Sequence, residues 1–314
     1  MEVADFVAEA LAGRQDIEPF AGGYRHSADI GTTTLTFHAS SGADSRLTSI
    51  AMVESRFTPG VVPDFDDDGI AWLNRRAVFG SFFRDAHSTG CRATYPIDNG
   101  FLEPDWQARR LLNALSDQRA FGIAIGLMDL SLEHCLASRK MFRVPRHWAT
   151  RLPSEGLEKV AHYLEQQFGL PATAGPASLV FEAPLTSGAT TRIVDPEAET
   201  ALISIRTDVQ HPVAGVGYCV TIMPPRQPPS ELLTMWCTKL NTLEHQQERF
   251  WPRLGAWGKR ELGTRLVYGM FWPTDEADAG EVRMLALEMA DRVNWIAGDL
   301  WLPGVGLHLQ RDTA

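Results

Sequence analysis

The sequence places the same order of helix and strand patterns in its first and second halves, and this repetition constrains the fold most. Apolar residues at the spacing of one helix face occur in residues 3–11 and again in residues 157–168. This spacing predicts an amphipathic helix near the start of each half. Ser154 marks the expected start of the second helix, and Gly169 marks its end.

Strand patterns follow each of these helices in the same order. Residues 33–38 (TTLTFH) match residues 178–182 (SLVFE), and residues 47–53 (LTSIAMV) match residues 201–207 (ALISIRT). Short alternating runs that are rich in β-branched residues are typical of strands with one buried face. The second half therefore repeats both the strand type and the strand order of the first.

The matches continue through a shared Leu-Asn pair, a predicted hairpin and a final helix. Leu73-Asn74 and Leu240-Asn241 each lie in a helical pattern, and hairpin patterns at residues 79–96 and 254–273 follow them. Helical spacing then recurs at Ala108, Leu111, Leu112 and Leu115 and at Val282, Leu285, Ala286 and Met289. Several matches in one order favour a tandem repeat. The alternative is two unrelated α+β domains.

Each copy reads as α-β-β-β-α-β-β-α, with the third strand of the first copy expected near residues 55–62. Consecutive strand patterns predict antiparallel sheets and disfavour a doubly wound sheet, in which strands and helices alternate. The predicted fold class is α+β: two tandem repeats, each a five-stranded antiparallel sheet with helices packed on one face, in a pseudo-twofold arrangement. The predicted domains are residues 1–137 and 152–314, joined by a linker at residues 138–151.

The predicted linker is basic in an otherwise acidic chain. It contains Arg139, Lys140, Arg143 and Arg146 beside Trp148, and it contains no acidic residue. One interpretation is a solvated connector, and the other is a docking strip for an acidic partner or a nucleic-acid backbone. These five residues are the candidate partner-binding residues of the sequence.

The order of elements resembles the type III secretion chaperone-like fold, which is shared with the YbjN family. In the first copy the resemblance rests on Leu73-Asn74, on residues 79–82 (FGSF) and on the strand and helix patterns at 92–97 and 103–115. In the second copy it rests on Leu240-Asn241, on residues 254–257 (LGAW) and on the patterns at 266–271 and 279–296. The second copy departs from the first by an insertion at residues 244–253.

The resemblance covers nearly the whole chain, once in each half, and it implies a binding role. Single-copy chaperones of this kind act as homodimers that present strands and hydrophobic grooves to an extended partner segment. Two fused copies would form that dimer within one chain. The resemblance therefore implies a monomer with an internal pseudo-dimer.

Composition and charge narrow the classes of function. The 314 residues are 44% hydrophobic and 22% charged, as is typical of a globular protein. A formal net charge of −10 disfavours nucleic acid as a partner. The sequence shows no secretory signal, no apolar run that would span a bilayer and no Cys-x-x-Cys pair among its four cysteines. We expect a cytoplasmic protein with free, buried thiols and no membrane association.

Residues 64–69 (DFDDDG) reproduce the first half of an EF-hand calcium loop. The twelfth position of such a loop is a bidentate glutamate, but here it is Arg75. We therefore interpret the acidic run as the start of a helix at residues 70–76, capped by Asp67 or Asp68. The alternative is a site for an opportunistic cation.

The sequence contains no His-Glu-x-x-His, phosphate-loop or Gly-x-Ser-x-Gly motif. We therefore expect no catalytic residue, no metal and no cofactor. The predicted function is a non-enzymatic protein-binding module, a chaperone or adaptor for an unknown partner protein. The alternatives are an accessory component of a bacterial toxin or antiviral defence system that acts by protein binding, and an enzyme with a site between the halves.

Overall fold

The structure is a computed structural model of the chain. It describes most of the two halves but not the segment that joins them. The described residues are 2–39, 47–62, 64–74, 80–86, 88–98, 104, 105, 107, 108, 110–112, 114, 115, 118, 154–185, 199–211, 215–225, 227–246, 255–259, 265–273 and 279–296.

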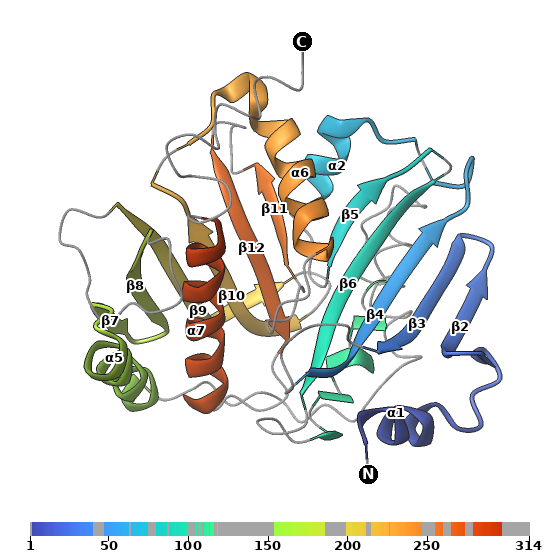
Figure 1. Ribbon diagram of the computed structural model, residues 1–314, viewed down its shortest axis with the longest axis horizontal. Coiled ribbons are helices and arrows are strands. Elements are labelled where there is room, and N and C mark those ends of the chain that lie inside the picture. Colours follow the sequence, from blue (N-terminus) through green and yellow to red (C-terminus); the bar gives the residue numbers. More distant parts are fainter. Residues whose placement is uncertain are drawn as a thin grey trace. The chain divides into compact units, whose positions relative to one another are not determined.

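The first sheet is a six-stranded antiparallel sheet with the strand order β1-β2-β3-β4-β6-β5. Its strands are β1 (Glu18–Phe20), β2 (Gly23–Ala28), β3 (Gly31–Ala39), β4 (Leu47–Phe57), β5 (Ser81–Arg84) and β6 (Thr89–Asp98). Helix α1 (Val3–Leu11) precedes the sheet, and α2 (Asp67–Asn74) connects β4 to β5. Figure 1 shows the long strands β3, β4 and β6 at the centre of this sheet.

The second sheet has the order β11-β12-β10-β9-β8-β7. Its strands are β7 (Ala172–Gly175), β8 (Ser178–Pro184), β9 (Thr200–His211), β10 (Gly215–Met223), β11 (Ala256–Lys259) and β12 (Leu266–Pro273). The helices of this half are α5 (Ser154–Phe168), the short 3₁₀ helix η2 (Ser230–Leu232), α6 (Leu233–Gln246) and α7 (Ala279–Ile296). Counted along the chain from β1 and from β7, the two sheets have the same strand order.

The predicted α+β class with antiparallel sheets is confirmed, but the predicted strand number is wrong. Each sheet has six strands, whereas α-β-β-β-α-β-β-α provides five. Strand β1 gives no clear strand pattern in the sequence because it has only three residues. Strand β2 gives none because His26 is its only buried residue. The expected strand near residues 55–62 is instead the end of β4, which stops at Phe57 before a turn.

The additional strands also change the correspondence between the halves. Residues 33–38 lie in β3, the third strand of its half, whereas the matched residues 178–182 lie in β8, the second strand. Residues 47–53 and 201–207 differ in the same way, because they lie in β4 and β9. The strand order therefore pairs β3 with β9 and β4 with β10, one strand later than the sequence match.

The chain divides into two compact units. Unit 1 comprises residues 1–146, 211–215 and 229–265, and unit 2 comprises residues 147–210, 216–228 and 266–314. Within unit 1, α6 and β11 both contact α2, and α6 also contacts β5; Figure 1 shows α2 and α6 side by side. Residues 229–265 thus pack with elements of the first half, although the sequence assigns them to the second copy.

One face of the first sheet forms the core of unit 1. Leu35, Val53 and Tyr95 point to this face and are almost fully buried. Gln118 is buried against it, since its side chain donates to the Val53 carbonyl (3.1 Å) and accepts from the Ser55 hydroxyl (3.2 Å). The opposite face of the same strands carries polar side chains.

In unit 2, the core face is formed by alternate apolar residues of β8, β9, β10 and β12, including Phe181, Ile203 and Val220. Helices α5 and α7 contact each other, and both contact β8, so they lie on the same side of the strands (Figure 1). Arg292 of α7 is fully buried, and its guanidinium carbon lies 4.3 Å from the centre of the Tyr268 ring. This cation–π contact compensates in part for the burial of the charge.

Candidate functional site: the polar face of the first sheet

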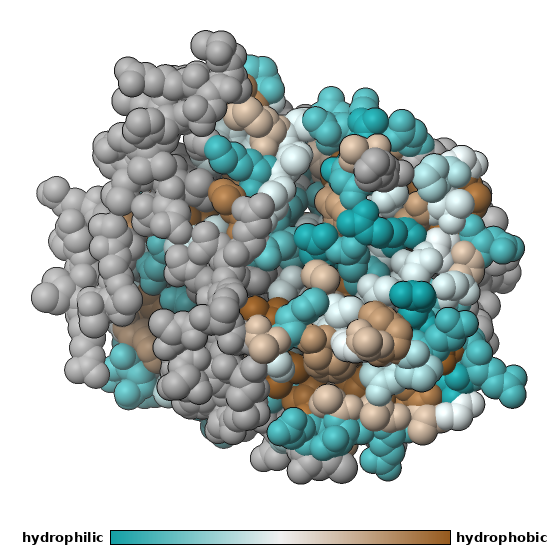
Figure 2. Space-filling view, turned by 45° about the vertical axis from the view of Figure 1, so that its right-hand side comes forward, coloured by the Kyte–Doolittle hydropathy of each residue, from teal (hydrophilic) through white to brown (hydrophobic). Residues whose placement is uncertain are grey.

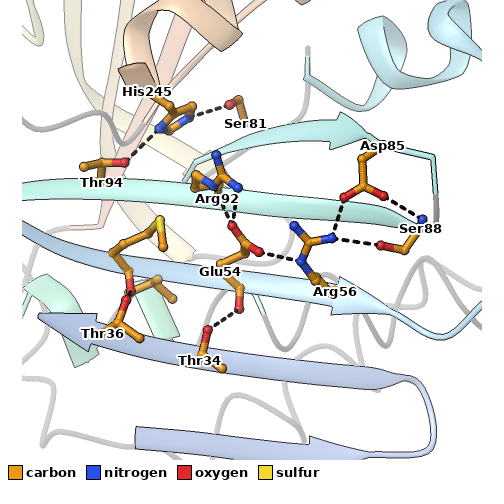
Figure 3. A network of polar contacts seen from close by, with 12 residues as sticks. Thr34, Thr36, Glu54, Arg56, Ser81, Asp85, Ser88, Arg92, Thr94 and His245 are labelled. Atoms are coloured by element: carbon orange, nitrogen blue, oxygen red, sulfur yellow. Dashed lines mark hydrogen bonds and ion pairs between the residues drawn. The ribbon is translucent and has the colours of Figure 1, made fainter. Parts of the chain in front are cut away.

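A row of polar side chains crosses the first sheet on the face opposite the core. Thr34 of β3 pairs with Glu54 of β4, Glu54 pairs with Arg92 of β6, and Arg92 pairs with Ser81 of β5. Side chains of directly paired residues lie on the same face of a sheet. The register alone therefore aligns residues of four neighbouring strands, and Figure 3 shows this arrangement.

Glu54 is the centre of the row because its carboxylate joins two arginines. Its Oε1 accepts from Nε of Arg56 at 2.6 Å, and its Oε2 accepts from Nε and Nη2 of Arg92 at 2.6 and 2.5 Å. The Glu54 side chain is only 11% exposed, whereas Arg56 is 44% and Arg92 is 32% exposed. The negative charge thus lies beneath two guanidinium groups that reach the surface.

Phe83 of β5 contacts both guanidinium groups. The guanidinium carbon of Arg92 lies 4.9 Å from the ring centre of Phe83, and that of Arg56 lies 5.5 Å from it. Gly90 provides the space for the ring, since a Cβ at Gly90 would lie 2.5 Å from the Phe83 ring. The arginines are therefore held by stacking as well as by ion pairs.

Asp85 and Ser88 complete the cluster at the turn between β5 and β6. Asp85 forms an ion pair with Nη1 of Arg56, and its other oxygen accepts from the Ser88 backbone N–H at 2.9 Å. The hydrogen bond that Arg56 donates to Asp85, together with the bond and charge of Glu54, raises the pKa of Arg56. The turn and β4 are thereby fixed to each other through charged side chains.

His245 of α6 lies over the same face. Its Nε2 is 2.7 Å from the Ser81 hydroxyl, and its Nδ1 is 2.9 Å from the Thr94 hydroxyl. A serine nucleophile and a histidine base would have the first distance, but in a catalytic triad a carboxylate binds the second nitrogen. Ser81 is also only 2% exposed. The contact therefore attaches α6 to β5 and β6 (Figure 3).

The acidic run at residues 64–69 starts helix α2, as predicted, but the capping residue is Asp66. Its Oδ1 accepts from the Gly69 backbone N–H at 2.8 Å. Asp68 instead binds Nζ of Lys259 at 2.6 Å and the hydroxyl of Thr234. The hydrogen bond from Lys259 is the main reason why the pKa of Asp68 is lowered. These carboxylates are therefore engaged by the protein itself.

The shared Leu-Asn pairs have a clear structural role. The Asn74 amide donates to the Phe82 carbonyl (3.1 Å) and accepts from the Phe82 N–H (2.6 Å). The Asn241 amide makes the same two bonds to Trp257, at 2.9 and 2.8 Å. Phe82 and Trp257 lie on β5 and β11, the terminal strands in the two sheet orders. Each asparagine thus satisfies the outward backbone groups of a terminal strand, as a further strand would.

The candidate residues of the sequence, Arg139, Lys140, Arg143, Arg146 and Trp148, lie outside the described residues. Of the predicted free thiols, Cys91 and Cys237 are buried and Cys219 is half-buried, and all three are free. Within the described ranges, no group of three or more metal-binding side chains occurs, and no helix is long and apolar enough to cross a membrane.

The sequence analysis missed the cluster around Glu54. Its only local signal is the pattern Glu54-Ser55-Arg56, in which two charged residues take alternate positions directly after the apolar run at residues 50–53. The partners Arg92 and His245 are distant in the chain, so only the register of β4 with β6 and the position of α6 bring them together.

Comparison of the chain with protein-family models, with curated proteins and with solved structures found no match. The resemblance to secretion chaperone-like domains therefore stays a prediction.

Proposed function

We propose that the protein is a non-enzymatic protein-binding module, a chaperone or adaptor, and that a partner binds on the polar face of the first sheet. The observation that carries the proposal is the stack of Arg56, Phe83 and Arg92 held by Glu54 on an exposed sheet face. Arginine and aromatic side chains are the residue types most often responsible for binding energy at protein interfaces.

Pre-organisation supports the proposal further. Long side chains lose conformational entropy when a partner immobilises them. Here Glu54 and Asp85 already fix both guanidinium groups through short ion pairs. The side chains therefore lose less conformational entropy when a partner binds. The Thr34 and Thr36 hydroxyls lie along β3 on the same face, which suits an extended partner segment. In Figure 2, which turns the right-hand side of Figure 1 toward the viewer, hydrophilic side chains form a band on the surface, and an apolar area lies below this band.

We also infer that the two halves are tandem repeats of one chaperone-like unit in a pseudo-twofold arrangement. Two observations support this inference: the strand orders correspond, and Asn74 and Asn241 make the same pair of bonds to the terminal strand that follows them. A fused pair would need no homodimer to complete the fold. The expected state in solution is therefore a monomer, which light scattering tests.

The binding proposal is tested by affinity capture with the full chain, followed by reconstitution with the purified partner. Mass spectrometry identifies proteins that co-purify in stoichiometric amounts, and calorimetry then measures the Kd for the wild type and for Arg56→Gln. Arg25→Gln is the matched control, because Arg25 lies on the same sheet face and stacks on Phe20 at 4.9 Å.

We expect Arg56→Gln to weaken binding about tenfold, which corresponds to about 1.4 kcal/mol for a central interface arginine. Arg25→Gln should change the Kd by less than about twofold, since peripheral contacts contribute little. Thermal melting of each variant establishes that it is folded. A partner that binds both variants as tightly as the wild type would refute the assignment of the surface.

A further inference from the structure

The cluster on the first sheet has an uneven distribution of charge between its interior and its surface. The Glu54 carboxylate is nearly buried, and the two guanidinium groups above it are the exposed atoms. Asp85, whose side chain is 34% exposed, offsets the charge of Arg56 on one side. The surface is therefore most electropositive beside Arg92, where no second carboxylate is bound among the described residues.

Hydrogen-bond donors remain on both arginines. Arg56 uses Nε for Glu54 and Nη1 for Asp85 and Ser88. Arg92 uses Nε and Nη2 for Glu54. Among the described residues, nothing accepts from Nη2 of Arg56 or from Nη1 of Arg92. A guanidinium group has five N–H donors in one plane, so each arginine keeps a terminal amino group for a ligand.

We propose that Arg56 and Arg92 form a carboxylate-binding pair, so that the partner segment presents an acidic side chain to this face. Guanidinium groups match a carboxylate in geometry and charge, and ion-paired hydrogen bonds are the stronger kind. Figure 3 shows both guanidinium groups directed at Glu54 from its two sides. This inference rests on the proposed function, because it names the chemistry of the partner at the same surface.

The ligand carboxylate enters beside Arg92, because Asp85 repels it at the far side of Arg56. Phe83 between the guanidinium groups contacts the aliphatic part of the acidic side chain, and Thr34 and Thr36 lie next to the segment's backbone. A glutamate in an extended segment provides both the carboxylate and the aliphatic part of the side chain. A glutamine at the same place lacks the charge and loses the ion-paired hydrogen bonds.

The experiment compares two blocked peptides, Ac-Val-Glu-Val-NH2 and Ac-Val-Gln-Val-NH2, added to the isotope-labelled full chain. NMR follows the side-chain Nε–H signals of Arg56, Arg92 and Arg25, and calorimetry follows the same titrations with the Arg56→Gln variant. We expect the Arg56 and Arg92 signals to shift saturably with the glutamate peptide and the Arg25 signal to stay in place. The glutamine peptide should bind about fivefold more weakly, as for the loss of one exposed ion pair.

Equal binding of the two peptides, or a shift of Arg25 as large as that of Arg92, would overturn the carboxylate assignment. In the Arg56→Gln variant the preference for glutamate should disappear, and a preserved preference would also count against the pair. The outcomes separate this inference from the proposed function. If Arg56→Gln weakens partner binding while the peptides bind alike, the protein-binding function stands and the carboxylate chemistry is wrong.

Discussion

Replacement of Asn74 by alanine should destabilise the protein far more than an ordinary polar substitution. The Asn74 side chain is 2% exposed and makes both of its bonds to the backbone of Phe82, which is also buried. Alanine removes both bonds from the buried backbone N–H and C=O of Phe82. Each such group costs about 1–3 kcal/mol, so we expect the free energy of unfolding to fall by about 2–6 kcal/mol.

Urea unfolding followed by tryptophan fluorescence measures this loss, and hydrogen exchange of the segment 80–84 gives a local readout. The Phe82 amide should exchange faster in Asn74→Ala than in the wild type. Asn74→Asp keeps an acceptor for the Phe82 N–H but places a carboxylate opposite the Phe82 carbonyl, so it should also destabilise. Asn241→Ala should behave like Asn74→Ala, because Asn241 makes the same bonds to Trp257.

Thr242→Ala is the matched control, because Thr242 is exposed and follows Asn241 in α6. It should change the unfolding free energy by less than about 0.5 kcal/mol. Losses below that value for both asparagine variants would refute the claim that these amides complete the terminal strands.

Three further predictions concern charged groups and thiols. Burial raises the pKa of Glu288 to about 8, although the positive charge of Arg292 acts in the opposite direction. The fold therefore favours the protonated carboxyl group, whose contribution to stability is present below about pH 4.5 and is lost as the pH rises through about 8. In urea unfolding at a series of pH values, Glu288→Gln should reduce this loss of stability by about 1–3 kcal/mol. Burial raises the pKa of Cys91, and it raises that of Cys237 to about 12, so iodoacetamide at about pH 8 should label both thiols only after unfolding, as peptide mass spectrometry will show; rapid labelling of the folded chain would contradict their burial. Calcium titration should give no stoichiometric heat in the micromolar range, because Asp66 caps α2 and Asp68 binds Lys259; tight binding that Asp66→Ala abolishes would overturn this.

Local periodicity was sufficient to predict the helices. The stripe of Val3, Val7 and Leu11 is the buried face of α1, and the apolar spacing at residues 157–168 and 282–289 lies within α5 and α7. This succeeds because residues three and four apart share a helix face whatever surrounds them. The antiparallel α+β class followed from the consecutive strand patterns, because a doubly wound sheet requires strands and helices to alternate.

Strand number was harder to predict because some strands carry little apolar alternation. Strand β1 has three residues, one of them Pro19, and β2 has a single buried residue. Their pairing is fixed by tight turns, such as the one at Gly22 with its positive φ of 91°. Strand β10, in contrast, has the apolar sequence GVGYCVTIM, so its signal was present in the sequence.

The candidate site could not be predicted because it depends on contacts between distant segments. Glu54 meets Arg92 only through the register of β4 with β6, and His245 reaches Ser81 from a helix of the other half. Asn74 and Asn241 were noticed as a repeated pair, but their bonds to Phe82 and Trp257 span eight and sixteen residues. Sequence similarity between the halves therefore indicated these residues without indicating what they do.

Hydroxyl-radical footprinting of the complex with the captured partner tests the central claim most directly. Met52 and Phe83 lie on the polar face and are half-buried, so both are accessible to oxidation in the free protein, and Phe168 of α5 is an exposed reference in unit 2. We expect the partner to slow oxidation of Met52 and Phe83 and to leave Phe168 unchanged. Protection of Phe168 with unchanged oxidation of Met52 and Phe83 would contradict binding at the polar face of the first sheet.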